Sequence, residues 1–378
     1  MNEPVAAIDL HREPIRSTAL LSRYAESTVW LARYMERIEN LARIIDVTET
    51  FTRTGQAEDG WRSIVQINAD SERFYERYER AEHQSMVSFY VLDRDSPTSI
   101  ATIINLAREN ARTLRPLIST EMWTHINMFH KWVRELTPND IRPGQLSRLC
   151  ARLKQECQTH NGITEGTFFR DQGWYFYVIG KHLERGDQIT RLVDIKYHTL
   201  LPKVAAVGSP VDMSQWSAVL RSAAAYHAYR RVMPRALTPA SVAGFLLLNN
   251  AFPRSLVLTL RHVYGALGQL RTDYGLRAGM AAQERIDELR AALADQTIEE
   301  IILRGLHEFL DWAQQQIHAV HDDVAAGFWP QPVVAAAAPA AEQPATLPPM
   351  TMEQRPGEQI MNGMRQSLPP LRSSTGEE

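Results

Sequence analysis

The sequence of 378 residues predicts an all-α protein: a multi-helix bundle with an internal duplication of one motif helix, followed by a disordered Ala/Pro-rich C-terminal tail. Three observations predict this fold class. Apolar residues recur at intervals of three and four positions over most of the chain, which is the period of a helix with one buried side. No segment alternates apolar and polar residues with the β-branched enrichment of a strand. Finally, one helical pattern of acids and arginines occurs twice, with matching positions 148 residues apart.

The repeated pattern places its charged residues on one face of a helix. Its members are Arg33, Glu36, Arg37, Glu39, Asn40, Arg43 and Asp46 in the first copy, and Lys181, Glu184, Arg185, Asp187, Arg191 and Asp194 in the second. Successive residues of a helix are about 100° apart, so that positions 36, 39, 43 and 46 share one side, as do positions 184, 187, 191 and 194.

Two interpretations of this charged face compete. Spaced ion pairs on a solvated helix face would produce the same pattern. However, Ala32 and Gly180 lie within the charged stripe, where a solvated helix would favour long polar residues. A small residue there indicates close approach of another backbone or of a ligand. We therefore expect a buried or cleft-lining charge cluster, with the two motif helices packed against each other.

The first part of the chain, residues 19–201, is expected to contain both motif helices. Residues 1–18 lack periodicity and are expected to form a flexible arm. The predicted helices are 22–53, 61–92, 97–115 with Ser96 as its cap, a segment that contains Glu121 and stops before Pro138, 145–159 closed by Asn161-Gly162, and a motif helix that starts near Trp174 and ends before Pro202.

The second part, residues 211–329, follows a break at Pro202–Pro210. Its predicted helices are 214–232, 239–249, 253–272, 281–293 and 298–324, the last with a capping box between Thr297 and Glu300. We expect this part to pack on the first as one domain. Residues 330–378 change abruptly to Pro, Ala and Gln and cannot bury a core.

The composition excludes several classes of protein. Lys and Arg number 41 against 44 Asp and Glu, a formal net charge of −3 with mixed signs, which does not favour a nucleic-acid surface. No N-terminal segment resembles a signal peptide, and the longest apolar stretch, Val242–Leu248, is too short to span a membrane. Cys150 and Cys157 form no disulfide framework. We expect a soluble cytoplasmic protein with no nucleic-acid or membrane partner.

Strong enzyme motifs are absent from the sequence. It contains no Walker loop, no G-x-G-x-x-G after a strand, no G-x-S-x-G and no H-E-x-x-H. Neither motif helix has the Glu-x-x-His of a di-iron bundle, and the cysteines lack the spacing of a zinc site. His307, His318 and His321 in the last helix are more typical of surface His–Asp pairs than of a metal site. We expect no metal, and the sequence identifies no cofactor.

Two other clusters are candidate ligand contacts. Tyr226, Tyr229 and Arg230 lie on adjacent turns of one helix, although tyrosines at this spacing more often belong to the core. The run Phe252-Pro253-Arg254-Ser255 opens a helix in this interpretation. That position would place Arg254 and Ser255 beside free backbone N–H groups, which favour an anion.

Six ordered blocks give the chain a family resemblance. They are Leu21–Glu26 running into Trp30–Asn40, Arg108–Arg112, Ser119–Trp123 with Asn127, Arg170–Trp174 leading to Leu183–Asp187, Tyr226–Arg230, and Val242–Leu248 followed by Phe252–Leu256. In these blocks, over about residues 20–325, the sequence resembles the alpha-E domain family. Four polar members of the blocks join the candidate cluster: Glu109, Asn110, Arg112 and Glu121.

The resemblance implies an all-helical bacterial protein associated with circularly permuted ATP-grasp proteins and transglutaminase-like proteins, in gene neighbourhoods for making or modifying peptides. Three functions then remain open. The protein is an accessory or substrate-binding partner of an ATP-grasp amide or peptide ligase, or an enzyme of the same system that acts on an anionic or amide substrate through Glu36 and Glu184, or its charge network is purely structural.

The pKa of a carboxylate beside arginine is normally lowered, which argues against a general acid in the enzyme alternative. A water-filled cleft beside Glu36 and Glu184 would support either of the first two functions. A sealed network would support the third.

Overall fold

Every regular element that the structure describes is a helix. The structure is a computed structural model that describes residues 20–53, 60–200, 210–233 and 237–329. The predicted all-α class is therefore confirmed. The predicted N-terminal arm, the C-terminal tail and most of the break at 202–210 lie outside the described residues.

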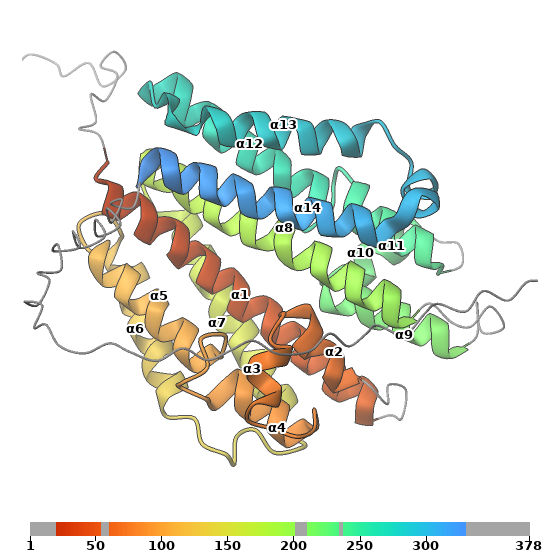
Figure 1. The fold of residues 1–378 in the computed structure, drawn as a ribbon. Coiled ribbons are helices and arrows are strands. Elements are labelled where there is room, and N and C mark those ends of the chain that lie inside the picture. Colours follow the sequence, from red (N-terminus) through yellow and green to blue (C-terminus); the bar gives the residue numbers. More distant parts are fainter. Residues whose placement is uncertain (1–19, 54–59, 201–209, 234–236, 330–378) are drawn as a thin grey trace, which may run out of the picture. The chain divides into compact units, whose positions relative to one another are not determined.

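Two long helices, α1 (Ser22–Arg53) and α8 (Gln172–Leu200), carry the two copies of the motif and run parallel (Figure 1). Their N-termini lie at the same end, where the backbone N–H of Leu20 donates to Gln172 Oε1 at 3.1 Å. Both matched the predicted ranges closely because their apolar periodicity is long and uninterrupted.

The other long helices form two layers around this pair (Figure 1). On one side α5 (Ile100–Thr113) and α7 (Leu146–Thr167) pack on α1, and α6 (Thr120–Arg134) packs on both. On the other side α12 (Leu256–Tyr274) and α14 (Ile298–Phe328) pack on α8, and α13 (Met280–Ala294) packs on both of those. The motif therefore lies in the interior.

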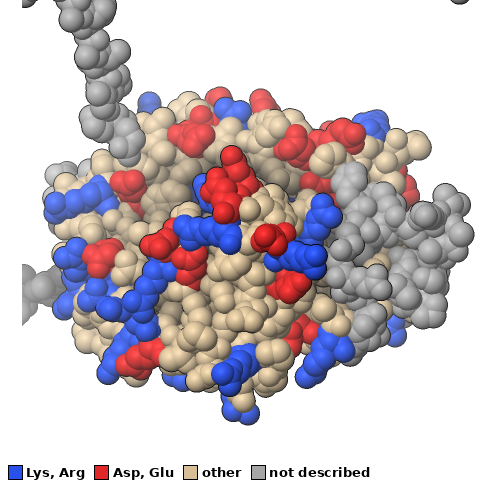
Figure 2. Space-filling model, turned by 60° about the horizontal axis from the view of Figure 1, so that its bottom comes forward, with Lys and Arg blue, Asp and Glu red and all other residues tan. Residues whose placement is uncertain are grey.

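Short helices complete the fold. They are α2 (Gly60–Ile67), α3 (Ser71–Tyr75), α4 (His83–Val87), the π-helix η1 (Ser88–Leu92), α9 (Pro210–Ser222), α10 (Tyr226–Val232), α11 (Pro239–Leu248) and the 3₁₀-helix η3 (Arg277–Gly279). None of the described helices is long and apolar enough to cross a membrane. On the face shown in Figure 2, Lys and Arg side chains are interspersed with Asp and Glu.

Two predicted helices were wrong because the chain turns inside them. The segment predicted as one helix over 61–92 is divided into α2, α3, α4 and η1. The first turn has Ala69 at φ 55°, and the buried Asp70 after it accepts a hydrogen bond from Tyr90 at 3.1 Å. The segment predicted over 214–232 is divided between α9 and α10 at Ala224, whose φ is 57°. Neither alanine is a residue that signals a left-handed turn.

Three predicted helix ends were also wrong. The cap of α5 is Ser99, whose Oγ accepts from the Thr102 N–H at 3.1 Å, and not Ser96. Helix α7 continues through Asn161-Gly162 to Thr167. Helix α12 begins at Leu256, after the cap Ser255, so that Pro253 and Arg254 belong to the preceding turn. The capping box at the start of α14 is confirmed.

Candidate functional site

The two motif helices touch at one of the small residues in the charged stripe. Gly180 on α8 packs directly against the backbone of Val29 on α1. Ala32 is also buried. The close approach indicated by the small residue at 180 is thus an approach of another backbone, which brings the two charged faces together in the interior.

Each glutamate of the motif pairs with the arginine of the other copy. Arg185 donates from Nε and Nη2 to the two carboxylate oxygens of Glu36, at 2.9 and 2.8 Å. Arg37 binds Glu184 in the same way, at 2.7 and 2.8 Å, and Arg33 adds a third hydrogen bond to Glu184 at 3.0 Å. Two-point contacts between guanidinium and carboxylate are strong and fix the geometry. Neither copy of the motif completes its own pair.

Arg254 adds a second guanidinium to Glu36. Its Nη1 donates to Glu36 at 2.6 Å and to Asn40 Oδ1 at 2.9 Å, while its Nη2 lies 2.9 Å from Glu39 Oε1. The prediction of an anion beside Arg254 is corrected in one respect, because the anion that the residue binds is an internal carboxylate. Ser255 is fully buried and caps α12.

The outer acids of the motif also have basic partners. The pairs are Glu39–Arg43 (2.5 Å), Asp187–Arg191 (2.9 Å), Asp187–His318 (3.0 Å), Asp46–Lys154 (2.6 Å) and Asp194–His307 (2.7 Å). The pair with i,i+4 spacing is present in both copies. The partners from outside the two motif helices differ. Glu39 and Asp46 of α1 pair with Arg254 and Lys154, whereas Asp187 and Asp194 of α8 pair with His318 and His307 of α14.

The arginines keep the motif glutamates ionised. Glu36 is 2% exposed and Glu184 is fully buried. Burial alone would raise the pKa of Glu36, but the charges of Arg185 and Arg254 hold that pKa well below its ordinary value. Arg37 and Arg33 likewise lower the pKa of Glu184 against the effect of burial. Both carboxylates are therefore acceptors whose oxygens are occupied, and neither has a proton to donate at neutral pH.

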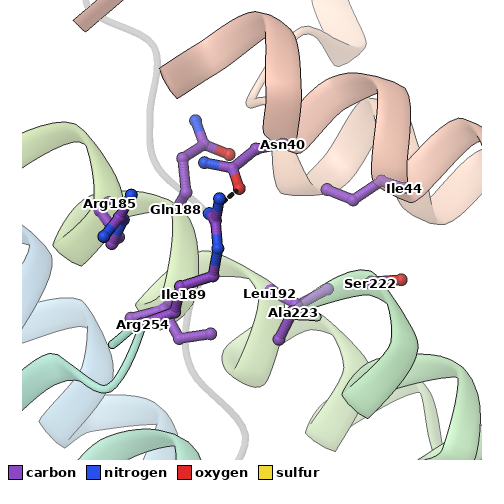
Figure 3. A pocket seen from close by; sticks show the side chains of 9 residues that line it. All are labelled: Asn40, Ile44, Arg185, Gln188, Ile189, Leu192, Ser222, Ala223 and Arg254. Carbon is purple, nitrogen blue, oxygen red and sulfur yellow. Dashed lines mark hydrogen bonds between the residues drawn. The ribbon is translucent and has the colours of Figure 1, made fainter. Parts of the chain in front are cut away.

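The interior of this network is nearly filled. Figure 3 shows the cavity beside it, whose lining includes the polar residues Asn40, Gln188, Arg185 and Arg254. Its volume is about 20 Å³, which is room for one water molecule. Neither glutamate lines any of the larger cavities found among the described residues. The geometry of these residues is that of a sealed network, which holds α1, α8 and the start of α12 together.

The candidate residues on α5 and α6 form a separate surface cluster. Glu109 accepts from Arg108 at 3.0 Å and from Arg112 at 2.6 Å. Arg108 also donates to Asn127 on α6 at 2.8 Å, which joins two of the family blocks. Asn110 is half-buried on the same helix and Glu121 is exposed on α6. Among the described residues, no hydrogen bond or ion pair joins these side chains to the motif network.

The tyrosine cluster of α10 divides between core and surface. Tyr229 is fully buried, and its hydroxyl lies 2.6 Å from Ser241 Oγ. Arg230 is exposed. Tyr226 is half-buried and lines a groove of about 660 Å³. The groove, which we call the α1–α10 groove, is lined by Arg43, Asp46, Val47, Thr50, Phe51, Lys154, Arg221, Ala224, Tyr226 and His227.

Several residues of the α1–α10 groove were not predicted as site residues. Val47, Thr50 and Phe51 continue the spacing of three and four from Arg43, which was the available signal on α1. Lys154 and Arg221 come from α7 and α9 and have no pattern in common with the motif. Only the packing of these helices brings them to the same groove.

Comparison with known proteins gives a family match and three distant relatives. A family model named Alpha-E, described as a predicted alpha-helical domain with a conserved ER motif, matches residues 20–329. Uncharacterized proteins of Mycobacterium bovis and of Mycobacterium tuberculosis (strain CDC 1551) are each 25% identical over 242 residues, 62% of this chain and 26% of theirs. An uncharacterized protein of M. tuberculosis strain H37Rv is 24% identical over the same length. The chain thus spans about a quarter of the relatives' length, and no solved structure matches it.

Proposed function

The chain belongs to the Alpha-E family, and we propose that it is an accessory, substrate-binding partner of an ATP-grasp amide or peptide ligase system. The observation that carries this proposal is that Glu36 and Glu184 lie apart from the open α1–α10 groove, which the outer end of the first motif copy lines through Arg43 and Asp46. Glu36 and Glu184 are buried and each is bound by two arginines. They are therefore suited to holding the helices together and not to proton transfer. The α1–α10 groove, which has the volume of a small-molecule site, begins where the buried network ends.

The groove suits the carboxylate end of a short peptide. Phe51 and Tyr226 offer apolar and aromatic surface, and Arg221 offers a guanidinium 4.2 Å above the Tyr226 ring. Arg221 is exposed and has no carboxylate within 4 Å among the described residues. By contrast, Lys154 and Arg43 in the same groove are held by Asp46 and Glu39. Among the described Arg and Lys residues of the groove, Arg221 is therefore the one without an acidic partner.

Two considerations support the partner assignment. The family resemblance implies association with circularly permuted ATP-grasp proteins and transglutaminase-like proteins. In the mycobacterial relatives about three quarters of the chain lies outside the matched region, which supports a function in which this domain works beside other domains. We also propose a cytoplasmic location, which the buried free thiols of Cys150 and Cys157 support.

The alternative function is an enzyme that acts through Glu36 and Glu184 on an anionic or amide substrate. The lowered pKa of both carboxylates and the 20 Å³ cavity oppose it, because a substrate amide could not reach either oxygen without displacing an arginine. The purely structural alternative accounts for the network but assigns no use to the groove.

Titration with a dipeptide tests the groove. We expect Ala-Phe to bind the purified full chain more tightly than Ala-Phe amide, which lacks the carboxylate. Arg221→Gln should weaken binding of Ala-Phe about tenfold or more, since a hydrogen bond to a charged group contributes roughly 1.5–3 kcal/mol. Arg230→Gln, an exposed arginine of α10 outside the groove, is the control. Equal affinity for Ala-Phe and Ala-Phe amide would show that the groove does not bind the peptide carboxylate.

Co-purification tests the partnership. The tagged full chain, expressed in its own cells, should retain an ATP-grasp protein, and mass analysis should find a peptide or amino acid in the complex. Glu36→Gln should reduce the yield of folded chain. A folded Glu36→Gln variant that keeps the partner but loses all product in the cell would favour the enzyme alternative.

A further inference from the structure

A second open pocket lies between the start of α12 and the end of α13. Its volume is about 430 Å³, which is in the range of small-molecule sites. Leu248 of α11, Val257 of α12, and Leu293 and Ala294 of α13 line it with apolar surface. Helix α13 packs along α12 (Figure 1), and α11 also packs on α12, which brings these side chains together. We call this space the α12–α13 pocket. It shares no lining residue with the α1–α10 groove.

The α12–α13 pocket is lined by two arginines and, among the described residues, by no acid. Arg261 comes from α12 and Arg290 from α13. Arg261 has no carboxylate within 4 Å in the described part of the chain. Arg290 pairs with Asp287 at 3.0 Å, but this aspartate is exposed and lies outside the pocket lining. The first turn of α12 and the last turn of α13 both reach the pocket, so that their dipoles oppose each other and the arginines determine its charge.

Both arginines have N–H donors to spare. Arg261 uses Nη2, which donates to Asn250 Oδ1 at 2.6 Å, and Arg290 uses Nη1, which donates to Asp287 Oδ1. Their Nε atoms and their other terminal nitrogens have no hydrogen-bond partner among the described residues. Arg290 also lies 4.5 Å from the centre of the Tyr264 ring, which restricts the plane of its guanidinium. The donors of a guanidinium form a planar fork that fits two oxygens of one anion.

We infer that the α12–α13 pocket binds a small molecule with an oxyanion, a carboxylate or a phosphate, on an apolar body. The oxyanion binds Arg261 and Arg290, because both line the pocket and have unused donors. The apolar body packs against Leu248, Val257 and Leu293. An inorganic anion would leave that apolar wall in water, and a neutral apolar molecule would leave the guanidinium donors unused. The inference is independent of the ligand proposed for the α1–α10 groove.

Titration of the purified full chain with hexanoate, monohexyl phosphate and hexanamide tests the inference. The three probes have hydrocarbon chains of similar length and differ in the head group. At least one of the two anions should bind about tenfold or more tightly than hexanamide, because charge-assisted hydrogen bonds to guanidinium are strong. Tighter binding of hexanoate identifies a carboxylate site, and tighter binding of monohexyl phosphate identifies a phosphate site. Equal affinity for all three probes, or no binding of either anion, would overturn the inference.

Methyl NMR of the unmodified chain locates the bound probe. The anion that binds should shift the methyl signals of Leu248, Val257 and Leu293 and leave those of Val47, in the α1–α10 groove, unchanged. Shifts at Val47 alone would place the anion in the α1–α10 groove and would overturn the inference. Acetate should bind more weakly than hexanoate, because it has no chain to pack on the apolar wall.

Three variants separate a built site from general attraction to a surface charge. Arg261→Gln should weaken binding of the preferred anion about tenfold or more. Arg271→Gln, at an exposed position further along α12 and outside the pocket, is the matched control. Ala294→Leu, at an exposed position of the lining, fills part of the space without a change of charge and should also weaken binding. Equal losses in Arg261→Gln and Arg271→Gln, or full affinity in both Arg261→Gln and Ala294→Leu, would contradict binding in the α12–α13 pocket.

Discussion

Gly180 and Val29 bring the backbones of α8 and α1 into direct contact. A Cβ atom at position 180 would lie 2.3 Å from the Val29 carbonyl oxygen and 2.8 Å from its Cα. The atoms in the way belong to the backbone and cannot rotate aside as a side chain can. This contact sets the distance across which Glu36 and Glu184 reach the arginines of the opposite helix.

Gly180→Ala is therefore expected to destabilise the fold. The methyl group must push α1 and α8 apart, and overpacking of a filled interior costs about 1–3 kcal/mol or more. The control is Gly162→Ala in α7, where nothing lies within 4 Å. That change should gain up to about 1 kcal/mol from helix propensity. Urea denaturation of both variants measures the difference, and a neutral Gly180→Ala would disprove the close approach.

Arg185→Ala should be one of the most damaging single changes. It leaves Glu36 buried with only Arg254, and loss of one partner from a buried pair costs about 3–5 kcal/mol. Arg112→Ala removes a comparable pair to Glu109, but the Arg112 side chain is 68% exposed. Its loss should cost less than about 1 kcal/mol. If chemical denaturation gave similar losses of unfolding free energy for the two variants, the motif would be a solvated helix face and not a buried network.

Arg43→Ala and Arg191→Ala should have independent effects. Arg43 binds Glu39, and Arg191 binds Asp187. The two arginines share no hydrogen-bond partner among the described residues, so that the double variant should be additive within roughly 0.3–0.5 kcal/mol. Glu36→Gln combined with Arg254→Gln removes both members of one contact and should depart from additivity by about 0.5–3 kcal/mol. Additivity in both combinations would contradict the contact between Glu36 and Arg254.

His160 makes stability depend on pH. It is fully buried in α7, and burial, followed by the effects of His125 and Lys181, lowers its pKa to about 3. In the unfolded chain it takes up a proton near its ordinary pKa, whereas in the folded chain it stays neutral. The unfolded state therefore binds more protons between pH 6.5 and 3, and stability falls as the pH falls through that window.

The slope contributed by one such proton is about 1.4 kcal/mol per pH unit. His160→Gln should remove this contribution whatever its effect on stability at neutral pH. Urea denaturation at several pH values between about 4 and 6, inside this window, measures how the free energy of unfolding changes with pH. His227→Gln, at an exposed position, is the matched control. An unchanged slope in His160→Gln would mean that this histidine is protonated in the folded protein.

Local sequence patterns predicted the helices better than they predicted which side chains contact one another. The ranges of α1 and α8 follow from long apolar periodicity, and the close approach at Gly180 follows from a small residue in a charged stripe. The turns at Ala69 and Ala224 could not be predicted, because alanine itself favours helix and the surrounding packing imposes the left-handed backbone. No local pattern indicates that Arg254 binds Glu36, because 218 residues separate them.

Because Glu36 pairs with Arg185 and Glu184 with Arg37, the order of synthesis determines when the core of this protein can form. Glu36 and Arg37 leave the ribosome 148 residues ahead of their counterparts on α8. At about 5–20 residues per second, this delay is roughly 7–30 s. During that interval α1 carries acids and arginines arranged for a partner helix that has not yet been translated. A nascent chain that ends before Gln172 can form helices α5 to α7 but cannot neutralise Glu36 with Arg185. We therefore expect α1 to remain accessible to protease and to chaperones until α8 has emerged.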